Sequence, residues 1–219
     1  MILSKNIHKF YENNHILKGI NLNIDEGEIV SLVGASGAGK TTLLQILGTI
    51  DSYDINSNAQ LILKNQDISK LNPVELASFR NQEIGFVFQF HQLLPEFNVI
   101  ENICIPAFIN KTPKQIAENK ANELIKYLGL EKRIYNKPNE LSGGEKQRVA
   151  VARALINEPS IILADEPSGN LDTAASDNLH QLFINLRKDF KYTFVIATHD
   201  ISLAKKSDRI LEIIDGKIK

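Results

Sequence analysis

The fold is decided by one stretch near the N-terminus, IVSLVGASGAGKTT, which runs from Ile29 to Thr42. Its first part, Ile29 to Val33, is nearly all apolar, as is typical of a buried strand in a parallel sheet. The residues that follow fit the pattern G-x-x-x-x-G-K-[ST], and Thr41 to Leu47 continue as a predicted helix. Strand, glycine loop and helix in this order are the context that a phosphate-binding loop requires.

Such a loop turns consecutive backbone N–H groups toward phosphate oxygens, and the following helix adds its positive end. We predict that Lys40 lies near the β- and γ-phosphates of a nucleotide and that Thr41 ligates Mg²⁺ through its hydroxyl. A glycine-rich surface turn is the alternative interpretation. The predicted nucleotide-binding residues of this loop are Gly34, Ala35, Ser36, Gly37, Ala38, Gly39, Lys40, Thr41 and Thr42.

A second glycine turn, LSGGEKQR, spans Leu141 to Arg148 and narrows the class of protein further. Ser142 and the glutamate three residues later fit a capping box for a helix predicted over residues 145–157. Capping explains the serine but not Gly143 and Gly144, which lower helix propensity. Bare N–H groups at a positive helix end favour an anion, so we predict that these residues contact a γ-phosphate.

The stretch from Ile161 to Glu166 predicts an apolar strand that ends in two acids. Neighbouring side chains of a strand point to opposite sides, so the two carboxylates can take different roles. We predict that Asp165 helps to hold Mg²⁺ and that Glu166 orients or deprotonates the attacking water. A solvated acidic turn before Pro167 is the alternative.

Three single residues gain a predicted role only from these motifs. Gln89 follows the strand Ile84 to Phe88, where its amide could reach both the metal and the water. His199 ends the strand Phe194 to Thr198 and could contact the γ-phosphate, and Tyr11 could stack on adenine. Taken alone, each fits an ordinary structural role. Stacking carries little base specificity, so the sequence does not choose ATP over GTP.

The remaining apolar runs indicate an α/β sheet with a helical lobe inserted into it. Ile20 to Ile24 alternate with polar residues, as in a half-buried strand. From about residue 90 to about residue 158 the pattern is helical, with one helix expected to start at Thr112-Pro113 and stop at Gly129. We therefore expect a single domain over residues 1–219. The runs predicted as buried parallel strands are Ile84 to Phe88, Ile161 to Ala164, Phe194 to Ala197 and Ile210 to Ile214.

Composition excludes several other classes. Hydrophobic residues make up 43% and charged residues 23%, as in globular proteins. A net charge of −1 disfavours nucleic acid binding through bulk electrostatics. The single Cys104 cannot form an internal disulfide, which fits a reducing cytosol. No apolar run approaches the roughly 18 residues that cross a bilayer, and no secretory signal is visible, so we expect action on the cytoplasmic side through a membrane partner.

In order and spacing, these motifs resemble the ATP-binding subunits of ABC transporters. The resemblance implies a P-loop NTPase core with a mixed sheet, an N-terminal antiparallel β subdomain and an inserted helical signature subdomain. It also implies ATP and Mg²⁺ as cofactors, and a head-to-tail homodimer in which Ser142 acts on the ATP of the other copy. The matching elements are Tyr11, Gly34 to Thr42, Gln89, Leu141 to Glu145, Asp165 with Glu166, Ser168 to Asp172, and His199.

A narrower resemblance is to lipoprotein-releasing ATP-binding subunits of bacterial envelopes, carried by Phe88 to Phe97, Glu101-Asn102 and Ser168 to Asp172. It implies two permease partners and a peripheral location at the cytoplasmic face of the inner membrane. Macrolide-export and cell-division ATPases share much of this pattern. Two departures stand out: the segment Asp51 to Leu61 lacks a common glycine turn, and Ser168 replaces a frequent threonine.

The alternatives from other classes are soluble ABC ATPases. Heads of DNA-repair ATPases carry long coiled coils before the signature, yet residues 40–142 hold no sustained heptads. Ribosome-associated factors usually join two ATP modules, and this chain has one set of motifs. Phe90 to Phe97 fit two roles equally well: a docking groove for a permease helix, or packing of the helical lobe.

Overall fold

Two sheets with different pairing patterns form the body of the protein in a computed structural model, which describes residues 1–54 and 58–219. The first sheet is antiparallel, with the strand order β2-β1-β4-β5. The open question about the loop within Asp51 to Leu61 falls partly outside the described residues. The strands of this sheet are β1 (Ile2–Tyr11), β2 (Asn14–Ile24), β4 (Gln60–Leu63) and β5 (Gln66–Asp67).

The second sheet has the order β10-β9-β3-β8-β7-β6, and it is parallel except for the pair β9–β10. The five strands predicted for this sheet are confirmed, each within one residue at either end. The prediction that all of them are buried was wrong for Ile210 to Ile214, where Ile210 is 47% and Ile214 39% exposed, because β9 lies near the edge of the sheet beside the short β10. The two sheets together give the mixed architecture that the resemblance implied. The strands are β3 (Ile29–Val33), β6 (Ile84–Phe88), β7 (Ile161–Asp165), β8 (Thr193–Ala197), β9 (Arg209–Ile214) and β10 (Lys217–Ile218).

Helix α1 (Lys40–Leu47) occupies the main core, where Leu43 and Leu47 are fully buried among residues of both sheets. On the other face of the parallel sheet, α6 (Thr173–Phe190) packs Phe183 against Phe194. Within residues 1–54 and 58–219, no helix combines the length and apolar composition that crossing a membrane requires. The other helical elements outside the helical subdomain are η1 (Ile68–Lys70), α2 (Pro73–Glu83) and α7 (Ile201–Ala204).

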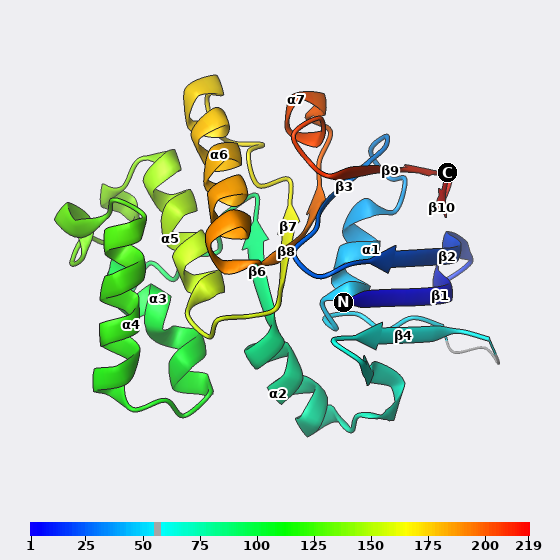
Figure 1. Ribbon diagram of the computed structural model, residues 1–219, viewed down its shortest axis with the longest axis horizontal. Helices are drawn as coiled ribbons and strands as arrows, with labels where there is room; N and C mark the ends of the chain where they lie inside the picture. Colours follow the sequence, from blue (N-terminus) through cyan, green and yellow to red (C-terminus); the bar gives the residue numbers. More distant parts are fainter. Residues whose placement is uncertain (55–57) are drawn as a thin grey trace.

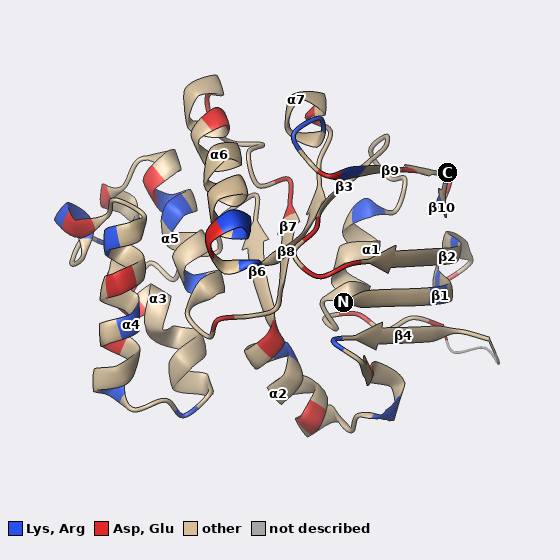
Figure 2. Ribbon diagram, viewed as in Figure 1, with Lys and Arg blue, Asp and Glu red and all other residues tan. Residues whose placement is uncertain are grey.

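A helical subdomain gathers on the side of the parallel sheet away from β1 and β2 (Figure 1). It has its own core, in which Ile103, Ala121 and Val149 are buried. Basic and acidic residues are interspersed along its outer helix, α4 (Figure 2). Its elements are α3 (Val99–Ile109), α4 (Lys114–Tyr127), η2 (Glu131–Arg133), η3 (Pro138–Glu140) and α5 (Gly143–Leu155).

The predicted start of α4 was wrong, whereas its stop is confirmed. The Thr112 amide donates to the Ala107 carbonyl and so closes the turn after α3, and Pro113 takes the N-cap position without a side-chain cap. At the other end, Gly129 has φ +66°, the left-handed conformation that ends helices. Thr112 is therefore used by the preceding turn, which the local pattern Thr-Pro does not reveal.

Helix α5 joins the two parts of the molecule because it packs on β6 as well as inside the helical subdomain. Gly85 on β6 permits this close approach. A Cβ at Gly85 would lie 2.5 Å from the Ala154 carbonyl oxygen and 3.2 Å from the Ala154 Cβ. The backbone oxygen cannot move without distorting α5.

We expect Gly85→Ala to lower the free energy of unfolding by about 1–3 kcal/mol, because the added methyl group overpacks this contact. Urea denaturation checks this value. Gly143→Ala is the matched control, since its Cβ would lie 3.7 Å from the Leu171 Cδ2, an ordinary contact, and we expect a change within about 0.5 kcal/mol. Equal unfolding midpoints for Gly85→Ala and the parent would contradict the packing argument.

Candidate functional site

The predicted phosphate-binding loop connects β3 to α1. Gly39 is the N-cap residue of α1 and has φ +107°, which L side chains rarely adopt. A Cβ there would also lie 2.8 Å from the Leu17 Cδ2 of the neighbouring hairpin, so only glycine fits. The loop therefore presents bare backbone at the positive end of α1, as a phosphate site requires.

Lys40 is the first residue of α1 and is only 8% exposed. Its Nζ donates to the carbonyl oxygens of Gly34, at 2.8 Å, and Ala35, at 3.1 Å. These bonds hold the ammonium group inside the curve of the loop. The loop thus carries a fixed positive charge where the predicted phosphates would bind.

Thr41 faces the end of strand β7, where its Oγ1 donates to the Asp165 Oδ1 at 3.1 Å. Burial raises the pKa of Asp165, the Thr41 hydrogen bond lowers it, and the nearby charge of Glu166 raises it further. Within the described part of the chain, no three His, Cys, Asp or Glu residues cluster as a metal cage. A hydroxyl and one carboxylate beside a phosphate loop nevertheless fit Mg²⁺, which takes few protein ligands and completes its shell with phosphates and water.

Glu166 and His199 form a second polar pair. The Glu166 Oε2 lies 2.8 Å from the His199 Nδ1 and also accepts from the His199 backbone N–H at 3.3 Å. Glu166 has φ +45°, an unusual conformation for a non-glycine residue, and its own N–H donates to the Ala197 carbonyl at 2.9 Å. Such strain is typical of functional positions, because the surrounding structure must hold it in place.

A cavity of about 570 Å³ brings most of the predicted residues together. This volume lies within the range of small-molecule sites. Ile16 of β2 also lines the cavity and was missed, because an apolar residue in an edge hairpin gives no local signal of binding. The lining residues are Ile16, Ser36, Gly37, Gly39, Lys40, Thr41, Thr42, Gln89, Glu166 and His199.

The topology explains this convergence. Strands β3, β8, β7 and β6 are adjacent and parallel, so their carboxyl ends lie along one edge. The phosphate loop follows β3, His199 follows β8, Glu166 follows β7 and Gln89 follows β6. Ligands of open α/β sheets bind at this edge. Four distant stretches of sequence therefore meet at one site.

Tyr11 lies outside the lining of this cavity, at the end of β1. The ring is 43% exposed, and its hydroxyl donates to the Asp51 Oδ2 at 2.6 Å. The structure thus places the predicted base platform beside the loop after α1.

The second glycine turn also lies apart from the phosphate loop. As predicted, Ser142 and Glu145 form a capping box: the Ser142 Oγ accepts from the Glu145 N–H, and the Glu145 carboxylate accepts from the Ser142 N–H. The helix begins at Gly143 rather than Glu145, because both glycines adopt its first turn. In the described chain, Ser142, Gly143 and Gly144 are absent from the lining of the 570 Å³ cavity.

The site combines a glycine loop that surrounds a buried lysine, two neighbouring acidic residues, a glutamine and a histidine. This combination defines a nucleotide-hydrolysing protein of the P-loop class. The ABC transporter family model matches residues 17–169, so the chain belongs to the ABC transporter family. It is the ATP-binding subunit type of that family, an ATPase with ATP and Mg²⁺ as cofactors.

Relatives match over the full length. The chain is 56% identical, over 100% of both sequences, to the lipoprotein-releasing system ATP-binding protein LolD of Bacteroides fragilis. It is 54% identical to LolD of Cytophaga hutchinsonii, over 97% of this chain and 95% of that protein. Among solved structures, the dimeric bacterial ABC transporter cassette MJ0796 matches with a TM-score of 0.89 and 38% identity, over 100% of this chain and 97% of that one. The same cassette bound to ADP and phosphate matches equally.

The raised pKa of Asp165 predicts how Mg²⁺ binding responds to acid. Mg²⁺ binds the carboxylate form, and a raised pKa keeps the competing proton bound up to a higher pH. We therefore expect Mg²⁺ affinity in the presence of ADP to begin to fall at a higher pH than an ordinary aspartate would allow. Mn²⁺ titrations followed by electron paramagnetic resonance, from about pH 8 to about pH 5, measure this profile.

Asp165→Asn should lower the metal affinity about tenfold or more. The pH dependence that remains should be that of the nucleotide phosphates alone. Asp177→Asn is the control, because the Asp177 carboxylate is exposed and pairs with Lys206. Identical pH profiles for the parent and Asp165→Asn would remove Asp165 from the metal site.

Proposed function

We propose that this chain hydrolyses ATP to power the release of lipoproteins from the inner membrane toward the outer membrane. The observation that carries the proposal is full-length identity of 52–56% to four lipoprotein-releasing system ATP-binding proteins. In this proposal residues 1–219 act as one domain with a helical subdomain over about residues 90–158. The chain binds peripherally at the cytoplasmic face through permease subunits, and it binds no nucleic acid.

The chemistry follows from the positions of the side chains. The loop N–H groups and Lys40 bind the phosphates, and Thr41, Asp165 and Gln89 would hold Mg²⁺, which would supply positive charge to stabilise the phosphates. Glu166 orients the attacking water and accepts its proton. The His199 contact at 2.8 Å keeps the Glu166 carboxylate turned toward the cavity.

A second copy of the chain completes the site. Ser142, Gly143 and Gly144 present N–H groups and a positive helix end, yet they lie outside the cavity of their own chain. In a head-to-tail dimer this helix end reaches the γ-phosphate bound by the partner. The MJ0796 cassette, which matches with a TM-score of 0.89 and is dimeric, supports the presence of a second copy.

We expect Glu166→Gln to bind ATP and to accumulate as an ATP-bound dimer, with turnover lowered about a hundredfold or more because proton acceptance is lost. Light scattering coupled to size exclusion, with Mg-ATP in the buffer, measures the dimer. Glu212→Gln, within strand β9, which β3 and β8 separate from β7 in the sheet, is the control and should turn over like the parent. A monomer of Glu166→Gln at saturating ATP would argue strongly against the shared site.

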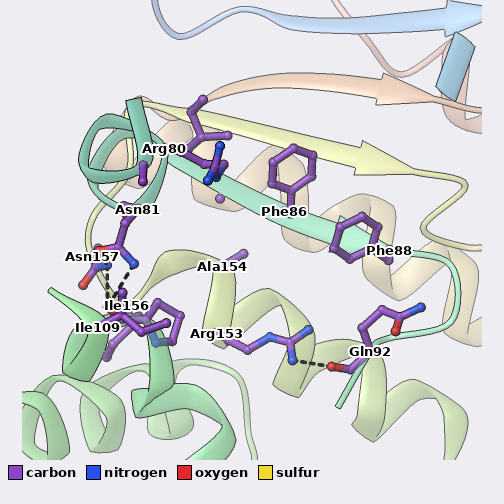
Figure 3. Close-up of a pocket in the computed structure, with 14 residues that line it drawn as sticks. Arg80, Asn81, Phe86, Phe88, Gln92, Ile109, Arg153, Ala154, Ile156 and Asn157 are labelled. Atoms are coloured by element: carbon purple, nitrogen blue, oxygen red, sulfur yellow. Dashed lines mark hydrogen bonds between the residues drawn. The ribbon is translucent and has the colours of Figure 1, made fainter. Parts of the chain in front are cut away.

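The permease has a candidate docking groove between the parallel sheet and the helical subdomain (Figure 3). Its cavity of about 470 Å³ is lined by α2, β6, α3 and α5. Arg153 of α5 crosses its floor and donates to the carbonyl oxygens of Gln92 and His91, both at 2.6 Å. The groove therefore adjoins the segment Phe90 to Phe97, directly after Gln89.

The apolar side chains of that segment divide between the two roles that the sequence left open. Leu93 packs against the core of the helical subdomain, whereas Phe90 is 69% exposed beside the groove. Ile109, on the α3 rim, is 67% exposed. We propose that an apolar permease helix covers these exposed residues and that movement of Phe90 to Phe97 links docking to Gln89.

A tagged form of the chain should retain integral permease subunits when purified from detergent-solubilised membranes. The complex, rebuilt in vesicles, should release lipoproteins in an ATP-dependent manner. Ile109→Glu should abolish retention, because it places a charge in an apolar contact, while ATP turnover of the isolated chain persists. Ile116→Glu, on the exposed face of α4, is the control and should retain the permeases.

Two results would contradict this proposal. Release of a macrolide but not of lipoproteins would favour the macrolide-export alternative. Hydrolysis stimulated by DNA or ribosomes, without captured membrane subunits, would favour the soluble classes.

A further inference from the structure

A three-residue network fixes the exposed ring of Tyr11. The Tyr11 hydroxyl donates to the Asp51 Oδ2 at 2.6 Å, and the Lys9 Nζ donates to the Asp51 Oδ1 at 2.7 Å. The Lys9 Nζ also lies 5.0 Å from the centre of the Tyr11 ring, a distance that allows a cation–π contact. The ring is therefore held both at its hydroxyl and over one face.

The buried end of this network is Lys9, which is only 8% exposed. A buried ammonium needs an opposite charge and further acceptors, and Lys9 has Asp51 and the Ser52 carbonyl at 2.7 Å. Burial opposes ionisation of Asp51, but hydrogen bonds from Lys9 and Tyr11 lower its pKa overall. The hydrogen bond to Asp51 raises the pKa of Tyr11, which shows that Asp51 favours the protonated hydroxyl that donates to it.

Asp51 is itself anchored to the helix that carries the phosphate loop. Its N–H and that of Ile50 both donate to the Gln45 carbonyl of α1, at 3.2 Å and 2.9 Å. Helix α1 begins at Lys40. The network thus joins the tip of the β1–β2 hairpin to the helix that binds the phosphates.

We propose that Asp51, supported by Lys9, is a positioning residue that fixes the Tyr11 ring at a set distance from the phosphate loop for stacking on a nucleotide base. This inference rests on the proposed ATPase function and on the role of Tyr11 as the base platform that the sequence predicts. A ring that is already ordered loses little freedom when the base binds, which improves affinity by about threefold to tenfold. The recognised group is the base of a nucleoside diphosphate or triphosphate.

The test compares ADP with inorganic pyrophosphate, which has the same two phosphates and no base. Calorimetry on the full chain measures binding of each ligand to the parent, Tyr11→Ala, Tyr11→Phe, Asp51→Ala and the double variant Tyr11→Phe/Asp51→Ala. We expect Tyr11→Ala to weaken ADP on the order of tenfold by loss of stacking. Tyr11→Phe and Asp51→Ala should each weaken ADP about threefold.

The double variant should bind ADP no more weakly than the single variant with the lower ADP affinity, because both changes break the same hydrogen bond. Pyrophosphate affinity should stay within twofold of the parent for all of them, since the phosphate loop is intact. The chain provides a matched control in Tyr127, whose hydroxyl donates to the Asp189 Oδ2 at 2.8 Å between α4 and α6. Tyr127→Phe and Asp189→Ala make the same chemical changes away from the site and should leave ADP binding unchanged.

The failures are distinguishable. If Tyr11→Ala binds ADP like the parent, the base platform itself is wrong, and the inference fails with it. If Tyr11→Ala weakens ADP while Tyr11→Phe and Asp51→Ala do not, the platform stands and the positioning role of Asp51 is overturned. The positioning role would also be overturned if the losses of ADP affinity add up in the double variant, or if pyrophosphate affinity falls as much as ADP affinity. In either case Asp51 would act independently of the Tyr11 ring.

Discussion

The shared edge of four adjacent parallel strands is the constraint on which the rest of this structure depends. Because β3, β8, β7 and β6 run in the same direction, their carboxyl ends deliver the phosphate loop, His199, Glu166 and Gln89 to one cavity. Antiparallel pairing of any one strand would send the site residues that follow it to the opposite edge. The nearly continuous apolar runs of these strands follow from the same constraint, since helices and the second sheet cover both faces.

The helical subdomain extends this edge through α5. Ala154 of α5 lies directly over Gly85 of β6, so the subdomain is fastened beside the strand that carries Gln89. The same helix presents the glycines of its N-terminus on another side of the molecule. A displacement of β6 therefore reaches both the groove lined by Arg153 and the helix end that we assign to the partner's ATP.

The sequence predicts most of this site because its motifs are local. The glycine loop, the acid pair and the strands that carry them each depend on a few consecutive residues, and the structure places them as expected. The start of α4 was mispredicted because the Thr112 N–H bonds to the Ala107 carbonyl, so that Thr112 belongs to the turn that ends α3. Ile16 and Asp51 were missed for a different reason: their positions depend on contacts between distant segments, which leave no pattern in the residues nearby.

The antiparallel hairpin brings a second, separate group of residues to the site. The parallel edge supplies the groups that we propose to act on phosphates, whereas the hairpin supplies Ile16 to the cavity and Tyr11 beside it. Hydrogen bonds to fixed points keep the hairpin in register with the core, since the Lys18 N–H donates to the Gly216 carbonyl at 2.8 Å and Lys9 pairs with Asp51. Base and phosphates can be bound together only if these two units keep a constant separation. Burying the Lys9 ammonium costs desolvation energy. Its ion pair with Asp51 is best explained as the contact that keeps this separation constant.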